Sequence, residues 1–107
     1  MSGTDKIVVL ITAPSEEEAV KIATALVDDK LAACVNIIPG LRSIYRWEGK
    51  ICDDREVLMV AKTRRSVFDR LKERVRSLHP YTTPEIIAIP VTAGFEDYLA
   101  WVDEKVV

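Results

Sequence analysis

Residues 31–63 read LAACVNIIPGLRSIYRWEGKICDDREVLMVAKT and predict two extended segments joined by a tight turn. β-Branched and aromatic residues, which favour strands, are frequent in both segments. Glu48-Gly49 between them suits a hairpin turn, because glycine accepts the positive φ that a short connection needs. As one strand, residues 31–47 would span roughly 55 Å at about 3.3 Å per residue, whereas a domain of this length has a radius of gyration of about 13 Å. We therefore expect the strand to bend, to project beyond its own domain, or both.

The bend is predicted at Pro39-Gly40, because proline cannot donate to a strand ladder and glycine relaxes the backbone. Beyond it, a projecting hairpin would leave Ile44, Tyr45 and Trp47 in water. We therefore predict that these three residues form a subunit interface and that further copies of the chain cover them. The alternative for Tyr45 and Trp47 is stacking on a ligand.

The rest of the chain predicts the order strand, helix, strand, strand, helix, strand, helix. The expected strands outside the hairpin are residues 6–12 and 85–92. Ser15 is the expected N-cap of the first helix and Ser66 that of the second, and residues 95–106 form a terminal helix. This order predicts one α+β domain over residues 1–107, with a ferredoxin-like βαββαβ fold, a long β-hairpin and an added C-terminal helix.

Composition excludes several classes of protein. The 107 residues are 49% hydrophobic and 30% charged, with a formal net charge of −2, which gives no overall reason to bind nucleic acid or an anionic membrane. The longest apolar runs are far below the roughly 20 residues that cross a bilayer. Cys34 and Cys52 lack metal-ligand spacing and are expected to be free thiols in the cytoplasm.

The densest group of polar residues is HPYTTPE, residues 79–85, a loop that two prolines stiffen. His79 and Glu85 at its ends could share a divalent cation, and imidazole suits copper or zinc. The alternative is structural: His79 ends a helix, and Glu85 pairs with a nearby base. Lys62 and Arg64 are candidates for binding an anionic ligand.

Motifs along nearly the whole chain resemble those of the CutA family of divalent-cation tolerance proteins. They are Ala32–Gly40 (AACVNIIPG), Ser43, Tyr45, Trp47, Gly49-Lys50, Glu56, Lys62-Thr63, His79-Pro80-Tyr81, Pro84-Glu85, Tyr98-Leu99 and Trp101. The resemblance implies a cytoplasmic homotrimer of ferredoxin-like subunits whose hairpins pair between subunits. It also implies tolerance to copper and other divalent cations, with metal binding at His79 and Glu85. Some members place a cysteine where this chain has Ile11, so a soft Cu(I)-type site is not expected.

Three functions follow as hypotheses. The leading one is a non-enzymatic trimer that weakly binds copper or another divalent cation and uses no organic cofactor. The second is a regulatory trimer, resembling nitrogen-signalling proteins, that binds a small molecule or anion through Lys62 and Arg64. RNA binding is disfavoured because residues 57–61, a central strand, hold no aromatic side chain. An enzyme is not expected, since the one histidine has no evident nucleophile beside it.

Overall fold

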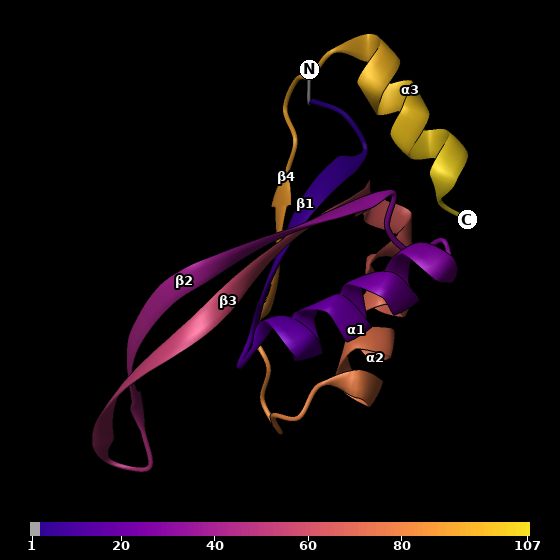
Figure 1. The fold of residues 1–107 in the computed structure, drawn as a ribbon. Helices are drawn as coiled ribbons and strands as arrows, with labels where there is room; N and C mark the ends of the chain where they lie inside the picture. The colour runs from indigo at the N-terminus through magenta and orange to yellow at the C-terminus, as the bar shows by residue number, and fades with distance from the viewer. Residues whose placement is uncertain (1–2) are drawn as a thin grey trace.

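The structure, a computed structural model, describes residues 3–107 as a single sheet with helices (Figure 1). In chain order the elements are β1 (Lys6–Ala13), α1 (Glu16–Asp28), β2 (Cys34–Trp47), β3 (Lys50–Arg64), the 3-10 turn η1 (Arg65–Val67), α2 (Phe68–Leu78), β4 (Ile86–Pro90) and α3 (Glu96–Lys105). Among these residues the strands form one antiparallel sheet in the order β2-β3-β1-β4. The predicted α+β, ferredoxin-like arrangement with an added C-terminal helix is confirmed.

Helices α1 and α2 lie side by side on one face of the sheet and enclose the core (Figure 1). Alternate residues of β1 and β3 face them, as the two-residue period of a strand requires. The core side chains that are fully enclosed include Val9, Ile11, Ile22, Leu26, Met59, Leu71 and Val75. Ile11 therefore belongs to the core.

The opposite face of the sheet is also apolar, and α1 and α2 do not cover it. We call it the open face and define it by Val8, Leu10, Ile38, Leu58, Val60, Ile87 and Ile89. Ile87 is 51% exposed and Ile89 46% exposed in the single chain. Adjacent exposed apolar side chains of this kind mark a surface that another molecule covers.

The hairpin of β2 and β3 both bends and projects. Figure 1 shows it curving away from the helices, and the longest principal extent of the molecule is 44 Å. The two strands lose register between Ile38 and Leu41, where Gly40 has φ 84°, so Pro39-Gly40 forms a β-bulge. At the tip, Glu48 and Gly49 both have positive φ, as in the two-residue turns that match strand twist. The predicted bend and turn are confirmed.

The two predicted helix caps have different outcomes. The Ser15 hydroxyl accepts a hydrogen bond from the Glu18 backbone N–H at 3.2 Å, as expected of an N-cap. The prediction for Ser66 is wrong. After β3 the backbone N–H of Arg65 bonds to the Asp5 carbonyl at 2.8 Å and the chain enters a 3-10 turn, so Ser66 lies inside η1 and α2 begins at Phe68.

Pro90 is the last residue of β4, and β4 is an edge strand of the sheet. Proline lacks a backbone N–H, and this loss costs little at the end of a strand or on an edge strand. β4 ends at Pro90, two residues before the end of the predicted range of 85–92.

Thr63 provides a test of how the hairpin is fixed to the domain. Its side chain is fully buried, and its hydroxyl donates to the Leu31 carbonyl at 2.7 Å, which joins the end of β3 to the segment before β2. Thr63→Val removes this donor from a buried carbonyl, so we expect the free energy of unfolding to fall by about 1–3 kcal/mol. Urea unfolding followed by circular dichroism at fixed protein concentration measures the change. Thr63→Ser keeps the hydroxyl and should lose less; a valine variant as stable as the parent would contradict the role of this bond.

Candidate functional site

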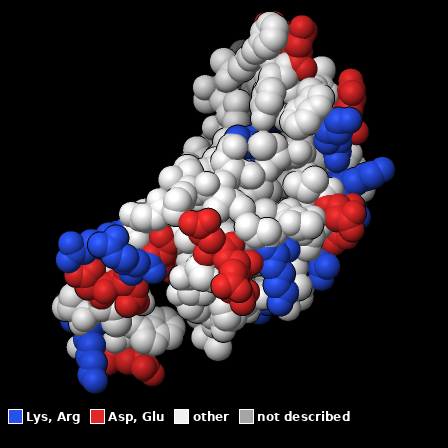
Figure 2. Space-filling model, viewed as in Figure 1, with Lys and Arg blue, Asp and Glu red and all other residues white. Residues whose placement is uncertain are grey.

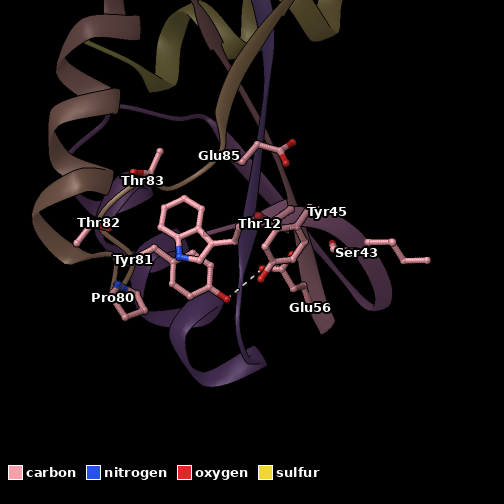
Figure 3. Close-up of a pocket in the computed structure, with 11 residues that line it drawn as sticks. Thr12, Ser43, Tyr45, Glu56, Pro80, Tyr81, Thr82, Thr83 and Glu85 are labelled. Atoms are coloured by element: carbon pink, nitrogen blue, oxygen red, sulfur yellow. Dashed lines mark hydrogen bonds between the residues drawn. The ribbon is translucent and has the colours of Figure 1, made fainter. Parts of the chain in front are cut away.

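A cavity of about 650 Å³ lies between the outer hairpin and the loop that follows α2 (Figure 3). This volume falls within the range of small-molecule sites, about 300–1,000 Å³. We call it the hairpin cavity and define it by its lining residues: Thr12, Ser43, Ile44, Tyr45, Trp47, Glu56, Pro80, Tyr81, Thr82, Thr83 and Glu85.

The bulge at Pro39-Gly40 decides which hairpin side chains reach this cavity. Before the bulge Ile38 pairs with Leu58, and after it Leu41 pairs with Glu56. The extra residue on β2 therefore shifts its alternation, so that Tyr45 shares a face with Glu56. An unbroken ladder would have turned Tyr45 to the other face.

Glu56 and Tyr81 form the hydrogen-bonded part of the cavity. The Tyr81 hydroxyl donates to Glu56 Oε2 at 3.1 Å, and Figure 3 shows this bond joining the loop to β3. Glu56 is only 9% exposed. Burial, followed by the adjacent Glu56 carboxylate, raises the pKa of the Tyr81 phenol, so Tyr81 keeps its proton to a higher pH than an exposed tyrosine does.

Tyr45 is held in a similar way from the hairpin side. Its hydroxyl donates to Asp54, and this hydrogen bond raises the pKa of the Tyr45 phenol. Both phenols are therefore neutral hydrogen-bond donors whose rings remain uncharged.

The lining of the cavity is acidic. Glu56 and Glu85 contribute carboxylates, and the eleven lining residues include no lysine or arginine from the described part of the chain. The hydroxyls of Ser43 and of three threonines supply further polar groups. The cavity therefore favours ligands that carry positive charge.

His79 anchors the loop instead of facing the cavity. It is 8% exposed, and its Nε2 donates to the Thr12 carbonyl at 2.7 Å, since a carbonyl can only accept. Its Nδ1 accepts from the Tyr81 backbone N–H at 3.1 Å. Both ring nitrogens are thus engaged within the chain.

The fit of a metal ion to these residues is poor within one chain. Glu85 lines the cavity, but His79 does not, and its ring offers no free lone pair. Over residues 3–107 there is no group of three or more His, Cys, Asp or Glu side chains placed to hold a metal ion. Ile11, fully buried in the core, supplies no soft ligand.

Lys62 and Arg64 lie apart from the hairpin cavity. Lys62 donates to Asn36 Oδ1, while Arg64 bonds to the Val107 carbonyl and pairs with Asp103 at 3.5 Å. Neither residue is part of the cavity lining. Anion binding by the pair stays a prediction, and the structure does not bring it to the cavity.

A nucleic-acid interface gains no support from the structure. Three of the four basic side chains of α2 pair with carboxylates: Lys72 with Asp69, Arg74 with Asp29 and Arg76 with Glu73. Within residues 3–107 the fourth, Arg70, forms no ion pair. The central strands β1 and β3 hold no aromatic residue on which bases could stack.

Glu56 lines the cavity, but it was not predicted from the sequence as a binding residue. It stood out only as part of a family motif. The bulge at Pro39-Gly40 is the signal that could have identified it. One extra residue on β2 reverses which face of the sheet the later side chains of β2 take, and this places Tyr45 on the same face as Glu56. Tyr81 lay within the loop that the sequence singled out, but its partner lies 25 residues away on β3.

The ferredoxin-like chain with a projecting hairpin and this cavity corresponds to a known class, the divalent-cation tolerance proteins. The sequence profile described as CutA1 divalent ion tolerance protein matches residues 7–105, and the chain belongs to this family. The divalent-cation tolerance protein CutA of Thermus thermophilus is 59% identical over 92% of this chain and 95% of its own length. The resemblance indicated by the sequence motifs is confirmed.

Solved structures agree with this assignment. The structure of a divalent cation tolerance protein from Thermus thermophilus superposes with a TM-score of 0.93 at 56% identity, covering 95% of this chain and 99% of that one. A second, the periplasmic divalent cation tolerance protein CutA of Archaeoglobus fulgidus, gives a TM-score of 0.93 at 47% identity, with the same coverage of 95% and 99%. The description of that protein as periplasmic leaves the cytoplasmic location of this chain a prediction. No helix among the described residues is long and apolar enough to span a membrane.

His79→Leu tests the structural role of the buried imidazole. Leucine fills a similar space but leaves the Thr12 carbonyl and the Tyr81 N–H without these partners. At about 1–3 kcal/mol for each of the two lost partners, we expect the free energy of unfolding to fall by about 2–6 kcal/mol in urea titrations. His79→Gln keeps a donor able to reach Thr12 and should lose less. Equal stability of the leucine variant and the parent would show that the two hydrogen bonds do not hold the loop.

Proposed function

We propose that this member of the divalent-cation tolerance family acts as a non-enzymatic homotrimer that weakly binds copper or another divalent cation. The observation that carries the assembly is the apolar surface that one chain leaves exposed. Its most exposed members on the hairpin and open face are Ile38, Ile44, Trp47, Ile51, Ile87 and Ile89. A monomer would keep this surface in water, whereas copies that share their hairpins and open faces would bury it.

The proposal of a non-enzymatic role is supported by the lining of the cavity. General acid–base or nucleophilic chemistry needs a base within hydrogen-bonding reach of a nucleophile. The imidazole of His79 is occupied by two backbone groups. The lining residues from the described part of the chain supply hydroxyls and carboxylates but no histidine or cysteine.

Weak metal binding agrees with the geometry better than tight binding. Glu85 remains the proposed oxygen ligand. His79 could join it through Nδ1 only after the bond from the Tyr81 N–H is broken, and the other ligands would come from water or another subunit. The bond from Nε2 to Thr12 would then orient the ring, as such bonds do in metal sites.

The alternative function, a regulatory trimer that binds a small molecule, is supported by the hairpin cavity itself. Its volume suits an organic ligand, and its residues come from both the hairpin and the loop. The acidic lining argues against an anion in this cavity.

Replacing apolar hairpin residues by lysine tests the assembly. The parent should have a mass of about 36 kDa by light scattering, three times the 12.0 kDa of one chain. In an Ile44→Lys/Ile51→Lys variant, buried and unpaired charges should shift the mass toward that of one chain. Val20→Lys is the matched control, since Val20 is 52% exposed on α1, away from the hairpin. A parent that is monomeric at micromolar concentration would contradict the proposal.

Isothermal titration with Cu²⁺ tests the metal. Glu85→Gln removes a charged oxygen ligand while keeping the size of the side chain, so we expect at least about a fivefold loss of affinity. Glu96→Gln, in the first turn of α3, serves as the control and should bind as the parent does. The same affinity in Glu85→Gln and the parent would remove Glu85 as a ligand.

A further inference from the structure

We infer that the hairpin cavity binds an organic cation, with an ammonium or guanidinium group held by Glu56 among the rings of Tyr45, Trp47 and Tyr81. This inference names the ligand class for the small-molecule alternative, and it does not depend on copper binding.

The first support is the partly partnered carboxylate of Glu56. The residue is only 9% exposed, and its Oε2 receives one hydrogen bond, from Tyr81. No described residue donates to Oε1, and Oε1 is not among the fully buried unpartnered atoms of residues 3–107, so it remains an acceptor at the border of the cavity. Among residues 3–107, no lysine or arginine forms an ion pair with Glu56 or Glu85, although seven such contacts occur elsewhere. A largely buried carboxylate with a free acceptor oxygen is stabilised by an opposite charge and by further hydrogen bonds. A cation in the cavity would supply both.

The second support is the aromatic lining. Tyr45, Trp47 and Tyr81 all border the space that Glu56 enters, and Figure 3 shows the two phenol rings close to Glu56. Aromatic faces attract organic cations at about 6 Å or less from the ring centroid, most strongly for tryptophan. Both phenols are neutral at neutral pH, and the upward shift of each pKa extends this state to higher pH, so the tyrosines stay hydrogen-bond donors to carboxylates.

The third support comes from the ligands that the lining disfavours. A phosphate or carboxylate would meet two glutamates and no basic side chain among the described lining residues. A bare metal ion would find too few ligands among residues 3–107 of one chain. An alkylammonium or guanidinium ion fits better, because its N–H groups can donate to Glu56 and its carbon atoms can contact the rings.

The cation could have two sources. One is a free small molecule. The other is a lysine or arginine side chain of a second copy, because the hairpin that lines the cavity also carries the proposed subunit contact. Both sources offer the same group to Glu56, and the experiment below separates them.

The probe is agmatine, which carries a guanidinium and an ammonium group on one short chain. In the full chain with Trp101→Phe, Trp47 is the remaining tryptophan, so its fluorescence reports on the cavity. We expect a saturable change with agmatine and none with glutarate, a dianion of similar length. Glu56→Gln should raise the agmatine dissociation constant at least about tenfold, as expected when a charged hydrogen-bond acceptor is lost, whereas Glu17→Gln, exposed on α1, should leave it unchanged.

Each outcome decides the inference. Saturable agmatine binding that depends on Glu56 supports a free ligand. If agmatine causes no change but Glu56→Gln, unlike Glu17→Gln, raises the concentration at which the trimer dissociates in sedimentation, the cation is a side chain of a second copy. If neither effect occurs, or glutarate binds as well as agmatine, the inference is overturned, while the trimer and copper proposals stand on their own tests. Should Glu56→Gln fail to fold, isothermal titration of agmatine into Trp47→Leu replaces it, with the same loss of affinity expected.

Discussion

The β-bulge at Pro39-Gly40 is the constraint on which the rest of this structure depends. A strand has a side-chain period of two, so one extra residue on β2 reverses the direction of every side chain beyond it. Because of this reversal, Tyr45 points with Glu56 toward the loop of residues 79–85, and Ile44 points to the other face of the hairpin. The same residue pair bends the strand away from the domain (Figure 1). A single local irregularity thus creates both an exposed hairpin and one wall of a cavity.

The second wall of the hairpin cavity, the loop of residues 79–85, is held in place by the buried imidazole of His79. His79 joins the end of α2 to the end of β1 through Thr12 and orders the next turn through the Tyr81 N–H, with the His79 and Tyr81 ring centroids 4.8 Å apart. Tyr81 then reaches across to Glu56 on β3. Three segments that are distant in sequence are therefore joined by a short chain of hydrogen bonds. Figure 2 shows charged side chains of both signs gathered on the hairpin, where Arg42 and Asp53 pair, so its surface is polar in places and apolar in others.

The sequence predicted most of the fold because the fold depends on local signals. Strand composition, the Glu48-Gly49 turn, the Pro39-Gly40 bend and the Ser15 cap each act within a few residues, and each is confirmed. The prediction of Ser66 as an N-cap failed because the Arg65 backbone N–H bonds to the Asp5 carbonyl and a 3-10 turn precedes α2. No local sequence pattern reports that tertiary contact. The candidate site was harder to predict from the sequence, because it too depends on contacts between residues that are distant in sequence. His79 and Glu85 were identified as a pair from their nearness in sequence, whereas the structure joins His79 to Thr12, 67 residues away.

The two faces of the hairpin connect assembly to the cavity. By strand register Ile44 and Ile51 belong to the face that alternates with that of Glu56, although Ile44 also borders the cavity. Tyr45 and Trp47 share the face of Glu56, and all four residues lie beyond the bulge. An isolated two-stranded hairpin is only marginally stable in water, so a contact on one face that orders its backbone would also order the side chains on the other face. Subunit association would thus reduce the entropy that a ligand loses on binding in the cavity, and a ligand would favour the associated form by the same free energy. Such coupling would act through the acidic, aromatic lining of the cavity, because Ile11 is buried in the core and both ring nitrogens of His79 are bonded within the chain.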